Sequence, residues 1–197
     1  MKKNELKIKI KNHPITRSTN SSSYVREKRR WDMSEEKNDY LSISHYLSYL
    51  LKQDIYIVMN TYFGTINKAL IDCGNTVIST DMTEKYYEFL SRDVQSTFKI
   101  IDIFSSVLYL GKADVVILFS KKIPYFNQFI SFIKSHSPKY IVLYTCEDCI
   151  TLLKDIEFEL SMDFLQILKD NLSSKLKILD LNRFFIFKNN KGEHHVL

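Results

Sequence analysis

Short apolar, β-branched runs alternate with stretches of helical periodicity from about residue 50 to residue 190, and this alternation constrains the fold more than any other feature of the sequence. Compact runs of this kind are typical of strands that are covered on both faces, as in a parallel sheet. They predict core strands at residues 55–59, 76–80, 98–101, 113–119 and 140–144. The chain of 197 residues is therefore expected to contain one α/β domain built on a mostly parallel sheet.

Helical periodicity marks the connections between these strands. We expect helices at residues 34–51, 65–73 and 83–90, from Pro124 onwards, and at 147–172. Near the end of the domain, the apolar segments 176–181 and 184–187 are separated by two residues and are predicted to pair as an antiparallel hairpin. Right-handed crossovers then place helices on both faces of the sheet and leave a ligand crevice at the carboxyl ends of the strands.

Positive charge is concentrated at the N-terminal end. Residues 1–30 hold ten Lys or Arg and two Glu, whereas the rest of the chain holds 18 basic and 21 acidic residues. This division predicts a flexible basic arm over residues 1–33 and an α/β domain over residues 34–197. Lys and Arg release counterions when they neutralise nucleic-acid phosphates, so the arm is a candidate RNA-binding extension. A solvated leader without a partner is the alternative.

The densest basic cluster of the arm adjoins the single tryptophan of the chain, Trp31. Cations beside an aromatic ring are suited to phosphate contact combined with base stacking. The predicted nucleic-acid contacts are Arg26, Lys28, Arg29 and Arg30. The alternative is a solvated segment that leads into the first helix of the domain and is anchored to the core by Trp31.

Composition argues against several classes of protein. No apolar run approaches the roughly 18–20 residues that a membrane-spanning helix needs, and the N-terminal residues lack the apolar core of a secretory signal. We therefore expect an intracellular protein (cytoplasm or nucleus) without membrane contact and with reduced cysteines. Cys146 and Cys149 have the spacing of half a zinc site, but no second pair of ligands has a matching spacing, so no metal is expected.

Two segments, IYIVMNTYFGTINKAL from residue 55 and GNTVISTD from residue 74, contain a predicted strand, a turn, a helix and a second strand that ends in an acidic residue. With the elements that follow, residues 50–190 resemble the class I S-adenosylmethionine-dependent methyltransferases. The resemblance implies a Rossmann-like, mostly parallel sheet with helices on both faces and a C-terminal antiparallel hairpin. It also implies S-adenosylmethionine as the cofactor.

The resemblance further implies which residues would bind that cofactor. Gly64 matches the last glycine of the turn after the first strand, which begins at Asn60, and Asp81 matches the acid that binds the ribose hydroxyls. Asp102 and Ile103, at the end of the third strand, match the place where the family often holds the adenine. As alternatives, the two aspartates could end strands or cap helices, and Gly64 could be a structural turn residue.

Two hypotheses for the function remain open. The first is a methyltransferase that acts on RNA presented by the basic arm, with its catalytic residues unassigned because residues 120–124 lack the Asp/Asn-Pro-Pro-aromatic motif. The second is a catalytically inactive methyltransferase-like subunit that binds a nucleic acid or a protein partner. Tyr62 and Phe63, which stand where the family has further glycines, favour the second hypothesis. A nucleotide-binding protein of another Rossmann-like kind is the third option.

Overall fold

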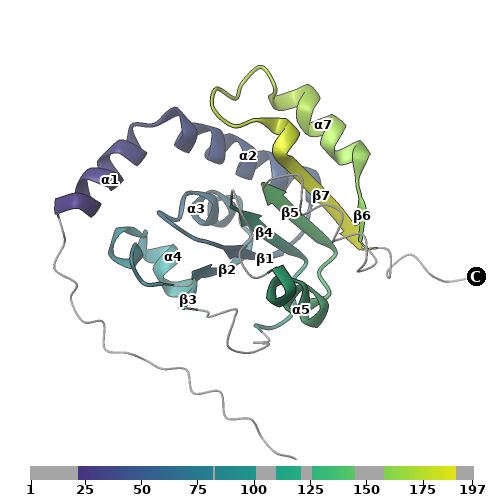
Figure 1. The fold of residues 1–197 in the computed structure, drawn as a ribbon, viewed down its shortest axis with the longest axis horizontal. Coiled ribbons are helices and arrows are strands. Elements are labelled where there is room, and N and C mark those ends of the chain that lie inside the picture. The colour runs from purple at the N-terminus through teal and green to yellow at the C-terminus, as the bar shows by residue number, and fades with distance from the viewer. Residues whose placement is uncertain (1–21, 82, 101–109, 121–125, 145–157, 190–197) are drawn as a thin grey trace, which may run out of the picture.

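A seven-stranded sheet forms the centre of the computed structural model, which describes residues 22–81, 83–100, 110–120, 126–144 and 158–189 (Figure 1). The strand order is β3-β2-β1-β4-β5-β7-β6. The strands are β1 (Ile55–Met59), β2 (Thr76–Asp81), β3 (Phe98–Ile100), β4 (Val115–Phe119), β5 (Tyr140–Tyr144), β6 (Phe158–Leu160) and β7 (Phe184–Asn189). The first five strands pair in parallel, and β7 runs antiparallel to both of its neighbours. This arrangement confirms the predicted Rossmann-like fold class with an antiparallel C-terminal pair.

Helices lie on both faces of the sheet. They are α1 (Ser22–Asp32), α2 (Glu35–Leu51), α3 (Thr65–Asp72), α4 (Arg92–Thr97), α5 (Phe126–His136) and α7 (Met162–Leu172), with 3-10 turns at Tyr87–Phe89 and Leu181–Arg183. Figure 1 shows α2 and α7 on one side of the sheet and α5 on the other. Within the described residues, no helix has the length and apolar character needed to cross a membrane.

The period of two along the strands divides the core into two layers. Val58, on one face of β1, joins the cluster beneath α2, α3 and α7, whereas its neighbour Ile57 joins the cluster beneath α5. Each central strand therefore buries both faces, which explains why the strands read as continuous apolar runs. The expected helices at 34–51 and 65–73 are confirmed as α2 and α3. Ser34 caps α2 by accepting a hydrogen bond from the Lys37 amide (3.1 Å).

The hairpin predicted between 176–181 and 184–187 is wrong in its first strand. The amides of Lys177, Ile178 and Leu179 donate to the carboxylate of Asp39 on α2, over 2.7–3.1 Å, so they cannot join a ladder. The antiparallel partner of β7 is instead β6. The long helix predicted at 147–172 is also wrong over 158–160, where β6 lies, but correct over α7; residues 145–157 lie outside the described part of the chain.

The helix predicted at 83–90 is wrong as well. That segment holds only the 3-10 turn Tyr87–Phe89, and the helix of this connection is α4, which the periodicity did not reveal. Six residues carry too few apolar positions for a periodic signal, and only Val94 of α4 is buried. Pro124 lies outside the described residues, and α5 begins at Phe126.

Residues 22–32 of the expected arm form helix α1, while residues 1–21 lie outside the described part of the chain. The indole nitrogen of Trp31 donates a hydrogen bond to the hydroxyl of Thr65 on α3 (2.9 Å). The indole also packs against Tyr40 of α2, with ring centroids 5.4 Å apart. Trp31 therefore anchors α1 to the domain, as the alternative interpretation of this segment proposed.

Candidate functional site

The loop at residues 60–64 follows β1 at the carboxyl edge of the parallel strands. Asn60, Tyr62 and Gly64 have left-handed backbones, with φ of 57°, 49° and 72°. For a residue with a side chain this conformation costs about 1–2 kcal/mol, so surrounding contacts must hold it. Thr61 supplies one such contact, because its amide and its hydroxyl both donate to the carbonyl of Thr80 at the end of β2 (3.1 and 2.9 Å).

Asp81, the predicted ribose acid, ends β2 beside this loop. Met59 and Thr80 are register partners, so Asn60 and Asp81 leave neighbouring strands at the same level of the sheet. One carboxylate oxygen of Asp81 accepts a hydrogen bond from the Tyr62 amide and the other accepts one from the Thr83 amide, each over 3.2 Å. Each oxygen keeps a further lone pair, so the carboxylate can still accept two hydroxyl groups.

Gly64 has a structural reason to be glycine besides its positive φ. A Cβ atom at this position would lie 3.0 Å from Leu90 and 3.3 Å from Val94. The missing side chain therefore allows the connection between β2 and β3 to pack closely against the loop. Asn60 is exposed at the end of β1. Asp102 and Ile103, the predicted adenine contacts, lie outside the described residues.

Tyr62 and Phe63 turn their rings toward α1 and toward the connection after β2. The Tyr62 ring lies 5.2 Å from that of Trp31 and 4.6 Å from that of Tyr86, measured between ring centroids. The Phe63 ring lies 4.7 Å from that of Tyr86. An aromatic cluster of Trp31, Tyr62, Phe63 and Tyr86 thus joins α1 to the two loops that follow β1 and β2.

Glu27 of α1 connects the same two loops through hydrogen bonds. One of its carboxylate oxygens accepts from the hydroxyls of both Tyr62 (2.8 Å) and Tyr86 (2.9 Å). Burial, together with the hydrogen bond to Glu27, raises the pKa of the Tyr62 hydroxyl, and burial raises that of Tyr86. Both phenols therefore stay protonated and act as donors.

The sequence interpretation did not identify Glu27 or Tyr86. They are separated by 59 positions, and only folding brings them together. One signal was present, since Tyr24, Glu27 and Trp31 recur at helical spacing and so share a helix face.

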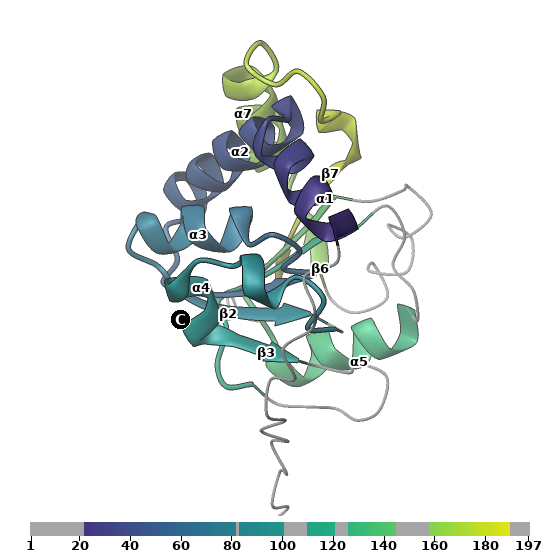
Figure 2. The same ribbon diagram turned by 90° about the vertical axis from the view of Figure 1, so that its left-hand side faces the viewer.

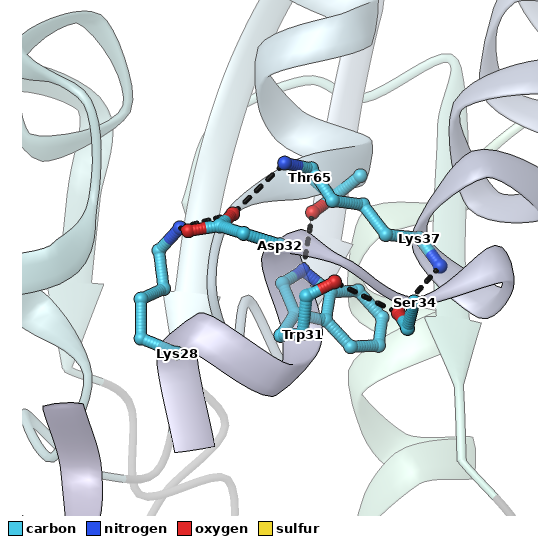
Figure 3. A network of polar contacts seen from close by, with 6 residues as sticks. All are labelled: Lys28, Trp31, Asp32, Ser34, Lys37 and Thr65. Carbon is cyan, nitrogen blue, oxygen red and sulfur yellow. Dashed lines mark hydrogen bonds and ion pairs between the residues drawn. The ribbon is translucent and has the colours of Figure 1, made fainter. Parts of the chain in front are cut away.

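The junction of α1 and α2 is held by ionic contacts (Figure 3). Asp32 binds the ammonium groups of Lys28 and Lys37, at 2.5 and 2.8 Å. Burial alone would raise the pKa of Asp32, but the hydrogen bonds and charges of the two lysines outweigh it and hold the pKa below its usual value. The hydroxyl of Ser34 also donates to the Trp31 carbonyl (2.8 Å). The ion pairs of Asp32 and the hydrogen bond of Ser34 therefore both hold the turn between the two helices.

The structure places the four predicted nucleic-acid contacts on different sides of α1. Arg26, Arg29 and Arg30 are exposed on α1. Lys28 faces the other way, because its ammonium group pairs with Asp32 and lies 5.6 Å from the centroid of the Phe63 ring. Among the described residues, no group of three or more His, Cys, Asp or Glu could hold a metal ion, and Cys146 and Cys149 lie outside them.

No protein-family model and no curated protein sequence matches this chain. Solved structures do match. Magnesium protoporphyrin IX methyltransferase (ChlM) from Synechocystis PCC 6803 with bound SAM aligns over 86% of this chain and 92% of its own, with a TM-score of 0.59 and 16% identity. The plantazolicin methyltransferase BpumL, in complex with a pentazolic desmethylPZN analogue and SAH, aligns over the same fractions with a TM-score of 0.60 and 10% identity. The chain has the Rossmann-like fold of the class I methyltransferases.

Proposed function

We propose that this chain, which has the class I methyltransferase fold, binds S-adenosylmethionine at the carboxyl ends of β1 and β2 and transfers its methyl group to a nucleic acid. Asp81 is the observation that carries the proposal. Its carboxylate stands at the end of β2, level with the loop after β1, and retains lone pairs for two further hydrogen bonds. Solved structures of this fold with bound SAM or SAH support the same cofactor here.

The residues at this edge fit the chemistry of that cofactor. Asp81 would accept hydrogen bonds from the two ribose hydroxyls, since a carboxylate has two oxygens at the spacing of a vicinal diol. Asn60 is exposed beside it, and its side-chain amide would hydrogen-bond the polar end of the cofactor. The hydrogen bond from the Tyr62 amide to Asp81 keeps this carboxylate directed along the loop.

When bound, the cofactor supplies a methyl group on a positively charged sulfur. A nucleophilic atom of the acceptor would form a bond to this methyl carbon as the carbon–sulfur bond breaks, and any proton on that atom would pass to solvent. The role of the chain is to hold the two partners in line, which contributes most of the rate in such a displacement. No general base from the chain is required for an acceptor that is already nucleophilic.

A nucleic-acid acceptor is supported by the charge on α1. Arg26, Arg29 and Arg30 are exposed on the helix that packs against the cofactor loops. Phosphate contacts on this helix would bring an RNA strand to the carboxyl edge of the sheet, where methyl transfer would take place.

The first experiment is calorimetric titration of the purified chain with S-adenosylmethionine and S-adenosylhomocysteine. We expect micromolar binding of both. Asp81→Ala should weaken it at least about tenfold, since two hydrogen bonds to a charged group are lost.

Asp72→Ala is the matched control. Asp72 is an exposed aspartate at the C-terminal end of α3, away from the loop at residues 60–64, and pairs with Lys68. This variant should bind like the wild type. No heat of binding at millimolar ligand with the folded wild-type chain would contradict the proposal and would favour a binding subunit without catalysis.

A further inference from the structure

Helix α1 has two faces of different chemistry. Arg26, Arg29 and Arg30 recur at the spacing of a single helix face and are exposed. Glu27 and Trp31 recur on another face and contact the domain. Figure 2 shows α1 on the side of the domain toward which β2 points, beside the loops of the candidate cofactor site. One helix therefore has exposed arginines on one face and contacts the cofactor loops with another.

The inward face reaches the candidate cofactor site in two steps. Glu27 accepts a hydrogen bond from the Tyr62 hydroxyl, and the amide of Tyr62 donates to Asp81. Glu27 also accepts from Tyr86, which lies five residues beyond Asp81 in the connection after β2. The Trp31 indole covers Tyr62 on the same side. The position of α1 thus affects both loops that flank Asp81.

We propose that α1 couples the two ligands: a nucleic-acid backbone bound to Arg26, Arg29 and Arg30 holds α1 against the loops, and loops held in this way bind S-adenosylmethionine more tightly. This inference rests on the proposed function. Glu27 acts as a positioning residue in it, because it works through Tyr62 and Tyr86 and not through contact with the cofactor.

The coupling has a physical basis in the marginal stability of α1. The helix has 11 residues, and isolated helices shorter than about 12–15 residues are marginal in water. Its anchor is only partly desolvated, since the Glu27 side chain is 37% exposed. A ligand that binds the docked helix stabilises it, and linkage requires the cofactor to strengthen nucleic-acid binding by the same factor.

The outward face fits nucleic acid better than a membrane surface. A helix that lies in a membrane interface needs a continuous apolar face in contact with the lipid. The aromatic residues Tyr24 and Trp31 of α1 contact the domain, leaving the arginines outside with Met33 just beyond the helix end. Guanidinium groups suit phosphate oxygens, which they can bind with two hydrogen bonds.

The test measures S-adenosylhomocysteine affinity of the full chain by calorimetry, with and without saturating oligouridylate. We expect oligouridylate to lower the Kd for S-adenosylhomocysteine by about fivefold or more. Glu27→Ala should abolish this gain while oligouridylate still binds, and Glu27→Gln, which keeps an acceptor oxygen, should restore part of it. The triple variant Arg26→Gln/Arg29→Gln/Arg30→Gln should lose oligouridylate binding. It should bind S-adenosylhomocysteine with the affinity that the wild type has without oligouridylate.

Fluorescence of Trp31, the single tryptophan of the chain, reports on α1 docking without any cofactor. We expect oligouridylate to change the Trp31 spectrum of the wild type and not that of Glu27→Ala. This result would support the role of α1 even if S-adenosylhomocysteine does not bind and the proposed function fails. Two results overturn the inference: oligouridylate binds and the Kd for S-adenosylhomocysteine is unchanged, or oligouridylate leaves Trp31 fluorescence unchanged. Tighter binding to phosphatidylserine vesicles than to oligouridylate would overturn the choice of partner.

Discussion

Each of the two N-terminal helices contacts the domain through a carboxylate that accepts several hydrogen bonds, Asp39 on α2 and Glu27 on α1, and the two contacts differ in kind. Asp39 of α2 is 2% exposed and accepts hydrogen bonds from three consecutive backbone amides, 177–179. Glu27 of α1 has a side chain that is 37% exposed and accepts from two side-chain hydroxyls. Asp39 joins α2 to the segment before β7, whereas Glu27 joins α1 to the loops of the candidate site.

This difference separates a structural contact from an adjustable one. Backbone amides cannot turn away, and a buried carboxylate without donors is costly, so the Asp39 contact holds whenever the domain is folded. Tyrosine hydroxyls can exchange a partly exposed carboxylate for water at little cost. The Glu27 contact is therefore suited to open and close while the domain stays folded.

The largest effect is expected at the buried contact. Asp39→Ala would remove a buried carboxylate that accepts from three backbone amides, of which only the Leu179 amide belongs to a buried residue, and should lower the free energy of unfolding by about 3 kcal/mol. Urea denaturation would measure the loss. Glu35→Ala is the matched control, because Glu35 pairs with Lys177 at the same junction but on the surface, and it should change little. A loss at Asp39 no larger than at Glu35 would refute the distinction.

A smaller effect is expected where α1 docks. Trp31→Ala removes the hydrogen bond to Thr65 and the contacts with Tyr40 and Tyr62, which together should contribute about 2 kcal/mol. Because α1 would detach while the domain remains folded, trypsin should cleave α1 at its basic residues faster than in the wild type. Tyr49→Ala, which truncates an aromatic ring that is 70% exposed on α2, should leave the cleavage rate unchanged. Equal rates for all three proteins would contradict α1 docking through Trp31.

The smallest effect is a dependence of α1 docking on pH. The lysine contacts lower the pKa of Asp32 in the folded chain, so their stabilisation is complete above its ordinary pKa of about 3.9 and is lost as the pH falls through the lowered value. The contribution should stay below about 1 kcal/mol because the pair is partly exposed. Trp31 fluorescence, followed from about two pH units above that ordinary pKa to about two pH units below it, would measure the loss. Asp32→Asn should remove this component, and an unchanged titration curve in that variant would exclude Asp32 as its source.

Local pattern was sufficient for most of the sheet. The apolar runs at 55–59 and 140–144 coincide with β1 and β5, because a strand buried on both faces needs no partner information to be recognised. Where the local pattern predicted the wrong element, a long-range contact determined the structure. The segment 176–181 has strand-like composition, but Asp39, 138 positions away from Lys177, takes its amides. No local signal in the segment reveals that acceptor.

The candidate site divides in the same way. The sequence alone determined that Asn60 comes directly after the first strand, that Asp81 ends the second, and that the basic residues gather before α2, since these follow from element order and charge. Only the tertiary structure decided that Gly64 packs against Leu90, that Glu27 binds Tyr62 and Tyr86, and that Lys28 turns away from the exposed arginines. Periodicity describes which face a residue occupies, whereas a hydrogen bond or ring contact depends on which distant face lies opposite, and that is decided by packing.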